Sequence, residues 1–287
     1  MRNHRKHWPA LLAAVVVSVA LLMAAGERAI SAPTTQDHTR QALTPIQVAI
    51  EEQRQRLSSG ETEDRRDALM QLRALQRPEA SRVALPALND PVAIVRATAA
   101  AAVLWLPADE SAASLIPLLS DKDEFVRQQT AYALGQTHSH SAVSALIERL
   151  ADKKDSVRAA AAVALGQIAD ATAVTSLAAV LSPQAGLTSV KGKKAPREQN
   201  PFVLRAAARS LGQIGNRAGL AALILALQDE KAANDIRREA AAALGAIGDA
   251  SAIPALREAE VAGDPYLAEA AHEAIGRISR SQINGGT

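Results

Sequence analysis

A twelve-residue segment that recurs along most of the chain constrains the fold more than any other feature. Its clearest copy runs from Val157 to Ile168, with Val-Arg near the start and Leu-Gly near the end. The glycines of successive copies are separated by 31, 46, 33 and 31 residues: Gly135, Gly166, Gly212, Gly245 and Gly276. A nearly fixed period in this range indicates supersecondary units stacked in a row.

Each copy has the periodicity of a helix. Apolar residues recur every fourth position at Val157, Ala161 and Leu165, which predicts a buried stripe. A second amphipathic segment, such as residues 141–150, precedes each copy, and abundant alanine favours close helix packing. The glycine predicts the helix end, because glycine adopts the left-handed conformation easily. Leu104, followed by Trp105, takes the glycine position in one copy, so that repeat is expected to turn differently.

These patterns predict an all-α protein, a right-handed α-solenoid of about seven two-helix repeats. Residues 43–78 fit the same register with more polar residues, and we interpret them as a degenerate N-terminal capping repeat, since an end repeat has one face in water. Residues 79–280 are expected to form the solenoid, and residues 281–287 a flexible tail.

The N-terminal residues predict export. Residues 1–26 combine a basic start with an apolar run, as in a signal peptide or an N-terminal membrane anchor, and residues 27–42 read as a flexible linker. The rest of the chain is then periplasmic or tethered to the inner membrane, and it meets the membrane only if the segment is uncleaved. Beyond residue 26 there are 29 basic residues (32 minus 3) against 30 acidic ones, which gives no indication of a nucleic-acid partner.

Aspartate and arginine recur six residues apart at equivalent places in three copies: Asp90 with Arg96, Asp121 with Arg127, and Asp152 with Arg158. Charges repeated at one phase are typical of a solenoid surface. We interpret them as a structural ladder in which each aspartate caps a helix start and each arginine bridges to the neighbouring unit.

The recurring segment resembles the V-R-x-x-A-A-x-A-L-G-x-I-G signature of the HEAT-repeat superfamily, in the short bacterial form of the phycobiliprotein lyases. The resemblance covers about residues 79–279 and implies a HEAT-like solenoid, whose relatives include scaffolds, chromophore lyases and iron-dependent hydroxylases. The hydroxylases bind iron through repeated His-Glu pairs, and this chain has Gln128-Gln129 and Ala159-Ala160 at two of those phases. The resemblance therefore gives no iron site.

No catalytic constellation is present in the sequence, and no cofactor is expected. His138 and His140 lie in a loop between units and are weak candidates for a metal site assisted by carboxylates. The expected function is non-catalytic protein binding or scaffolding through the concave face. The alternative is an enzyme or enzyme-assisting module like the chromophore lyases.

The concave face is expected at positions two, three and six after the opening valine of each second helix. These positions include a basic group, Arg205, Arg209 and Arg238, which predicts a partner protein or peptide bearing acidic residues. Tyr132 and Trp105 are the candidate anchors, because aromatic side chains dominate binding energies.

The step of 46 residues implies an insertion at residues 182–200. Four basic residues in it are candidate loop contacts: Lys191, Lys193, Lys194 and Arg197. Insertions in repeats are often binding elements, but a long loop also costs little entropy, so a tolerated loop without function remains the alternative.

Overall fold

A computed structural model describes residues 43–181 and 200–285 of the chain, which form fourteen α-helices and no strand. The predictions made for residues 1–26, 27–42 and 182–199 lie outside these described residues. No helix within the described part combines the length and the apolar character needed to cross a bilayer.

The helices form seven consecutive pairs. The first helices of the pairs are α1 (Pro45–Arg56), α3 (Pro78–Ala84), α5 (Ala108–Leu115), α7 (Val143–Arg149), α9 (Val174–Leu181), α11 (Leu220–Gln228) and α13 (Ile253–Glu260). The second helices are α2 (Thr62–Ala74), α4 (Ala93–Ala102), α6 (Glu124–Thr137), α8 (Asp155–Ile168), α10 (Pro201–Ile214), α12 (Asn234–Ile247) and α14 (Pro265–Gly285). Short 3-10 segments adjoin six of the first helices: Leu85–Asn89, Ile116–Ser120, His140–Ala142, Ala171–Ala173, Arg217–Gly219 and Ala250–Ala252.

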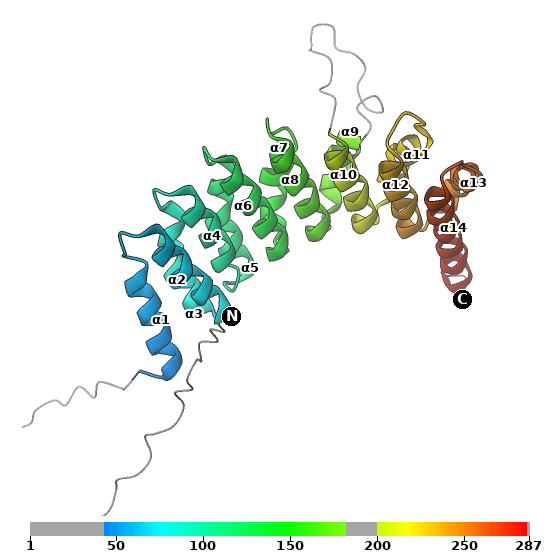
Figure 1. Ribbon diagram of the computed structural model, residues 1–287. Coiled ribbons are helices and arrows are strands. Elements are labelled where there is room, and N and C mark those ends of the chain that lie inside the picture. The colour runs from blue at the N-terminus through cyan, green and yellow to red at the C-terminus, as the bar shows by residue number, and fades with distance from the viewer. Residues whose placement is uncertain (1–42, 182–199, 286–287) are drawn as a thin grey trace, which may run out of the picture. The chain divides into compact units, whose positions relative to one another are not determined.

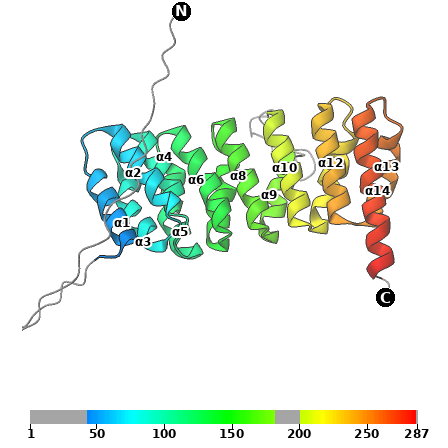
Figure 2. The same ribbon diagram turned by 60° about the horizontal axis from the view of Figure 1, so that its bottom comes forward.

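The pairs follow one another in chain order along a single row (Figures 1 and 2). Each second helix packs on the next second helix, and these contacts are much more extensive than those between successive first helices. This arrangement confirms the all-α solenoid of about seven two-helix repeats. We call the surface of the second helices that is turned away from the first helices the inner face.

The core between the two layers is made of leucine, valine, isoleucine and alanine. The leucines before four of the repeat glycines are among the largest fully buried side chains: Leu134, Leu165, Leu211 and Leu244. Alanine fills the remaining positions, as at Ala131 and Ala161, which both have no exposed surface. Short side chains let helices approach closely while keeping the density that protein interiors require.

The repeat glycines do not end their helices, contrary to the prediction. The second helices continue past them, and the left-handed residue comes three positions later, at His138, Ala169, Gly215 and Gly248. The repeat glycine lies instead at the contact with the next second helix. A Cβ on Gly245 would lie 2.7 Å from Ala274 Cα. Real Cβ atoms do not approach backbone atoms so closely, so the glycine is needed for helix packing.

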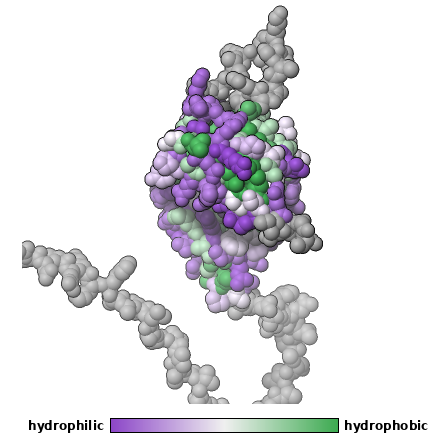
Figure 3. Space-filling model, turned by 90° about the vertical axis from the view of Figure 1, so that its right-hand side faces the viewer, coloured by the Kyte–Doolittle hydropathy of each residue, from purple (hydrophilic) through white to green (hydrophobic). Residues whose placement is uncertain are grey.

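The two ends of the row differ from the centre. At the N-terminus, Thr44 and Gln47 form a reciprocal capping box at the start of α1. At the C-terminus, α14 continues to Gly285, so residues 281–285 are helical and the prediction of a flexible tail from residue 281 was wrong for them. Figure 3 looks at this end of the row and shows mainly hydrophilic residues around smaller hydrophobic groups, as a terminal repeat requires.

Candidate functional site

The inner face carries one stripe of accessible side chains along all seven second helices. Each second helix contributes three positions to the stripe. They are the residue directly before Val157 or its equivalent, the sixth residue after it and the tenth residue after it. These positions lie within about 40° of one another on a helical wheel of 100° per residue. None of the residues is buried: Glu63, Met70, Ala74, Ile94, Ala101, Trp105, Phe125, Tyr132, Gln136, Ser156, Val163, Gln167, Phe202, Arg209, Gln213, Asp235, Ala242, Ala246, Tyr266, Glu273 and Arg277.

The predicted positions were partly wrong. Position six does lie on the inner face, but positions two and three face the neighbouring second helix in several repeats. Ala97, Ala159, Ala160 and Ala206 are all buried there. The second helices pack so closely that their flanks are covered, and only a narrow stripe stays accessible.

All five aromatic residues in the described part of the chain lie on this inner stripe: Trp105, Phe125, Tyr132, Phe202 and Tyr266. Four of them are 42 to 68% exposed, and Tyr132 is half-buried at the edge of the core. Aromatic side chains are large enough to dominate a core, yet none is used there. Sequence reasoning identified Trp105 and Tyr132 and missed the other three, which share the position before the opening apolar residue.

An open cavity of about 650 Å³ lies at the inner face where α2, α4 and α6 meet. Apolar atoms form the larger part of its wall, and Arg73, Gln76 and Gln136 contribute polar side chains. Its lining residues are Met70, Arg73, Ala74, Gln76, Ala101, Leu104, Trp105 and Gln136. Of these, Trp105 was expected as an anchor, whereas Met70 and Arg73 were not.

The cavity opens where the repeat glycine is missing. Arg73 in α2 and Leu104 after α4 stand at the glycine position, so these helices cannot approach as closely as α6, α8, α10 and α12 do. In addition, α4 ends at Ala102, about one turn earlier than its equivalents. The expectation that this repeat turns differently is therefore confirmed.

Two buried serines hold the early end of α4. The Ser81 hydroxyl donates to the carbonyl oxygen of Ala102 at 2.7 Å, and the Ser111 hydroxyl donates to that of Val103 at 2.9 Å. The backbone N–H of Trp105 donates in turn to the Ser81 Oγ at 3.3 Å. These bonds satisfy carbonyl groups that the helix end leaves free, and they fix the backbone of Trp105 at the rim of the cavity.

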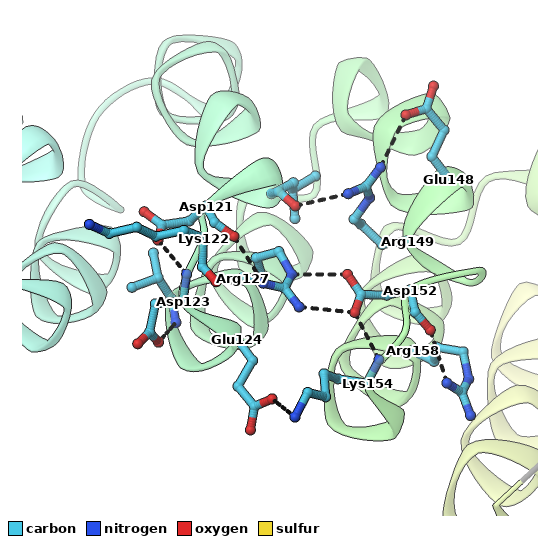
Figure 4. Close-up of polar contacts among 12 residues, drawn as sticks. Asp121, Lys122, Asp123, Glu124, Arg127, Glu148, Arg149, Asp152, Lys154 and Arg158 are labelled. Atoms are coloured by element: carbon cyan, nitrogen blue, oxygen red, sulfur yellow. Dashed lines mark hydrogen bonds and ion pairs between the residues drawn. The ribbon is translucent and has the colours of Figure 1, made fainter.

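The aspartate–arginine ladder is structural, as predicted, and its arginines bridge to the next repeat, as Arg127 does (Figure 4). The prediction that each aspartate caps a helix was wrong: Asp121 accepts the backbone N–H of Asp123, and Asp123 is the residue that caps α6. Arg127 reaches both carboxylate oxygens of Asp152 in the next repeat, with Nε at 2.9 Å and Nη2 at 3.1 Å. Its Nη1 donates to the carbonyl oxygen of Asp121, while Asp152 accepts the backbone N–H of Lys154. Arg65–Asp90 and Arg96–Asp121 repeat this geometry, and Arg65 extends the ladder beyond the pairs seen in the sequence.

The ladder carboxylates are held in their charged form. The hydrogen bonds from Arg96 lower the pKa of Asp121 below its usual value, against the opposing effect of burial. For Asp152 burial would raise the pKa, but the hydrogen bonds from Arg127 and the backbone N–H of Lys154 bring it below the usual value. Both partners of each pair are nearly buried and already bonded, so the ladder offers no site for a ligand.

The predicted basic group on the inner face is neutralised by its neighbours. Arg209 makes two hydrogen bonds to Glu239, at 2.8 and 2.7 Å, which raise the pKa of Arg209. Arg205 Nη1 lies 2.9 Å from Asp235. Arg238 donates to the carbonyl oxygen of Asn234 and lies over the ring of Tyr266, 5.5 Å from its centroid. The first two arginines therefore present no free positive charge to an acidic partner.

The two loop histidines each bond to the following repeat. His138 Nδ1 lies 2.9 Å from the carbonyl oxygen of Gln167, and His140 Nδ1 lies 2.6 Å from Asp170. Hydrogen bonds from Thr172 and His140 lower the pKa of Asp170 to about 2. Within residues 43–181 and 200–285, no three histidine, aspartate or glutamate side chains gather as a set of metal ligands. The candidate loop contacts Lys191, Lys193, Lys194 and Arg197 lie outside the described residues.

Three solved structures align with most of this chain. YibA of Escherichia coli aligns with a TM-score of 0.56 at 21% identity, over 82% of this chain and 82% of its own. The complex of CpcE and CpcF of phycocyanin lyase from Nostoc aligns with a TM-score of 0.47 at 22% identity, over 85% and 91%. Human deoxyhypusine hydroxylase aligns with a TM-score of 0.35 at 18% identity, over 80% and 96%. The likeness to YibA shows the fold alone.

No curated protein sequence matches the chain. The family model for HEAT repeats, however, matches residues 50–135, 112–188 and 193–280. These matches include most of the chain and every copy of the recurring segment from which the fold was predicted. The chain therefore belongs to the HEAT-repeat family.

Proposed function

We propose that this protein is a non-catalytic scaffold that binds another protein through the inner stripe. One observation carries the proposal: every aromatic side chain in residues 43–181 and 200–285 lies on that stripe, and the core contains none. Packing against the neighbouring second helices leaves four of these rings partly in water. Large aromatic side chains supply much of the binding energy at interfaces, so this placement favours a binding surface.

The cavity beside Trp105 supports the same function. A ring that is 42% exposed at the rim of a partly apolar cavity can be covered by an inserted side chain without any change in the fold. The rigid backbone around it, held by Ser81 and Ser111, keeps the cavity open before a partner arrives. A preformed site lowers the entropy cost of binding.

Site-specific photocross-linking in the cell that makes the protein tests the proposal. A benzophenone amino acid at Gln136, exposed on the inner stripe, is expected to capture one or a few defined proteins. The same probe at Ser144, exposed on the first helix α7, is the matched control and is expected to capture none of them. Equal capture from both positions, or from Ser144 alone, would contradict an inner-face function.

Substitution of the exposed rings provides a quantitative arm. The double variant Trp105→Ala and Phe125→Ala is expected to weaken the captured interaction by at least about tenfold, as loss of aromatic anchors does. Both rings are 42% exposed, so the variant is expected to unfold at a moderately lower temperature while keeping its helical content, and binding is measured well below that temperature. Leu225→Ala, at a 48% exposed residue on the first helix α11, should leave binding unchanged. Binding that survives the double variant would overturn the proposal.

An enzyme-assisting role like that of the chromophore lyases is the alternative. It rests only on membership of the same repeat family, which is an analogy of fold. The two functions predict different results for protein isolated from its own cell. An enzyme-assisting module would carry a bound chromophore or small molecule, which would be detected by its absorbance or as added mass. A scaffold shows partner proteins and no such group.

The proposed location is outside the cytoplasm, on the basis of residues 1–26 alone. Fractionation of the native cell, with N-terminal sequencing of the recovered protein, tests it. A new N-terminus near residue 27 in the periplasmic fraction would indicate a cleaved leader, and an intact N-terminus in the membrane fraction would indicate an anchor. Recovery in the cytoplasm with an intact N-terminus would contradict export.

A further inference from the structure

The open cavity beside Trp105 resembles a small-molecule binding site in its size and its lining. Its volume is about 650 Å³, within the range of about 300 to 1,000 Å³ that such sites span. Apolar residues supply five of its eight lining positions: Met70, Ala74, Ala101, Leu104 and Trp105. The other three are Arg73, Gln76 and Gln136. An apolar wall with a few polar groups is the usual composition of a ligand site, because the wall provides affinity and the polar groups fix the orientation.

Arg73 is the only charged residue among the described residues that line the cavity. Its side chain is exposed and makes no hydrogen bond or ion pair with any described residue. The arginines of the inner stripe differ from it, since Arg209 is paired with Glu239 and Arg277 with Glu273. A ligand that brings a negative charge to the cavity therefore finds an unneutralised counter-charge there, and a cationic ligand is repelled.

The place of Arg73 in its repeat explains why it borders the cavity. It stands in α2 where α6, α8, α10 and α12 have glycine, on the side of the helix that faces the next second helix. In those four repeats the next helix packs against the glycine. Beside α2 the early end of α4 leaves space, and the Arg73 side chain lines it together with Met70 and Leu104. A carboxylate bound to Arg73 is thus held in the same cavity as an apolar surface.

Two helix ends beside the cavity oppose the binding of an anion, but only weakly. Both α2 and α4 end here, and a helix C-terminus carries a partial negative charge. The backbone N–H groups of Leu75 and Gln76 already bond to carbonyl oxygens at the end of α2. The Ser81 and Ser111 hydroxyls do the same at the end of α4. A charge-assisted hydrogen bond from Arg73 is worth about three times the effect of one helix end, so the arginine decides the preference.

The apolar wall of the cavity is accessible to a ligand. Met70 is 47% exposed and Trp105 is 42% exposed. Covering them with an apolar body removes apolar surface from water, which is favourable in proportion to the area covered. A small anion without such a body covers none of this surface, and its bond to the exposed Arg73 is weakened by water. The cavity therefore favours a ligand that has both an apolar body and a negative charge.

We propose that this cavity binds a small molecule made of an apolar body and one carboxylate. The carboxylate bonds to Arg73, and the apolar body lies against Trp105 and Met70. The Gln76 and Gln136 amides, whose side chains make no hydrogen bond to any described residue, can donate to or accept from polar substituents of the ligand. This site goes beyond the scaffold function, because it needs only the cavity and no partner protein.

Trp105 provides the signal for a direct test. The chain contains two tryptophans, Trp8 and Trp105, so the full chain with Trp8→Phe reports on the cavity alone. Three probes share one skeleton and differ in charge: phenylbutanoate, phenylbutanol and phenylbutylamine. Acetate is the fourth probe and has the charge without the apolar body. Each probe is titrated while the Trp105 emission is recorded, and calorimetry detects binding that leaves the emission unchanged.

Phenylbutanoate is expected to bind in a saturable way and at least about tenfold more tightly than phenylbutanol, since only the acid gains the charge of Arg73. Phenylbutylamine should bind no better than the alcohol, and acetate should not bind at the concentrations that saturate the acid. Arg73→Gln is expected to reduce the affinity for the acid by about tenfold, to that of the alcohol. Arg77→Gln, which removes an exposed arginine that does not line the cavity, is the matched control and should leave the preference unchanged.

A second variant tests whether the ligand binds in the cavity. Ala74 is exposed and lines the cavity, so Ala74→Phe places a ring there without disturbing the core. Phenylbutanoate and phenylbutanol should both bind at least about tenfold more weakly to this variant. Its helical content, measured by circular dichroism, should be unchanged.

Equal binding of the acid and the alcohol, tighter binding of the amine, or no saturable binding of phenylbutanoate would overturn the inference. So would a preference for the acid that survives Arg73→Gln, or unchanged binding to the Ala74→Phe variant. The cross-linking experiment at Gln136 and Ser144 tests the scaffold separately. Capture from Gln136 without binding of phenylbutanoate would remove only this inference, and the reverse result would remove only the scaffold.

Discussion

At the scale of single residues, the repeat glycine and the residue three positions later have separate tasks. Gly212 and Gly245 lie against alanine backbone in the next repeat, where a side chain has no room. The residue in the left-handed conformation is glycine in two repeats, Gly215 and Gly248. In two other repeats it is His138, with φ of 53°, and Ala169, with φ of 59°. The first position is constrained by packing and the second by backbone conformation.

The packing role predicts a large cost for a methyl group. Gly245→Ala would place a Cβ 2.7 Å from Ala274 Cα, so α12 and α14 must move apart. We expect a loss of about 1 to 3 kcal/mol in the free energy of unfolding, measured by urea denaturation. Gly60→Ala is the control, because a Cβ there meets nothing within 4 Å. Equal effects of the two changes would show that the contact is not close.

The conformational role predicts a stabilising change. Ala169 adopts φ 59°, which strains an L-residue, whereas glycine adopts it easily. Ala169→Gly is expected to stabilise the protein by about 1 kcal/mol and to raise the melting temperature. Ala242→Gly, at an exposed position inside α12, should destabilise it by a similar amount. A loss of stability with Ala169→Gly would contradict this account.

At the scale of elements, the ladder ties each repeat to the next by nearly buried ion pairs. Arg127 and Asp152 have side-chain exposures of 5% and 6%, and the same arginine also holds the turn before its own helix. Where Leu204 replaces the arginine in α10, the regular pattern stops. From there on, pairs on the inner face, such as Arg209 with Glu239, connect the repeats.

Removing one member of the ladder is therefore expected to be costly. Arg127→Ala leaves the Asp152 carboxylate in a nearly buried place without its partner, and we expect a loss of about 3 to 5 kcal/mol. Arg54→Ala, which removes an exposed pair with Glu51 on α1, should cost less than about 1 kcal/mol. Denaturation in urea compares the two variants. Similar losses for both would mean that the ladder pairs contribute no more than surface pairs.

At the scale of the whole molecule, the ladder and the loop carboxylates make stability depend on pH in one direction. The pKa values of Asp121 and Asp152 are lowered by folding, and that of Asp170 falls from 3.8 to about 2. As pH decreases, the unfolded chain takes up protons first. The stabilisation is complete above the unfolded pKa of about 4 and is lost as pH falls through the folded values.

Thermal unfolding should therefore show a steep acid dependence. The melting temperature is expected to be nearly constant from about pH 7 to pH 5 and to fall continuously from about pH 4 to pH 2. Asp121→Asn should lower the melting temperature near neutral pH and make the fall with acid shallower, because one of the responsible carboxylates is gone. A melting temperature that stays constant down to about pH 2 would rule out this linkage.

Much of the architecture could be predicted because periodicity records burial within each repeat. Val157, Ala161 and Leu165 specify a helix face, and the period of 31 residues specifies stacking. Trp105 was correctly marked as unusual, since Leu104 replaced a glycine. The cavity beside it could not be predicted, because it depends on how far α2, α4 and α6 stand apart, and on Met70 and Arg73 from a repeat that lacks the signature.

The sequence by itself determined the number and kind of repeats, the pairing of helices and the existence of the ladder, because these follow from residue spacing inside one unit. Only the tertiary structure decided what each unit presents to its neighbour. It paired Arg209 with Glu239, put glycine against Ala274 and gathered the aromatic rings on one stripe. Such contacts join residues about one repeat apart, and they depend on the rotation between stacked units, which no local pattern encodes.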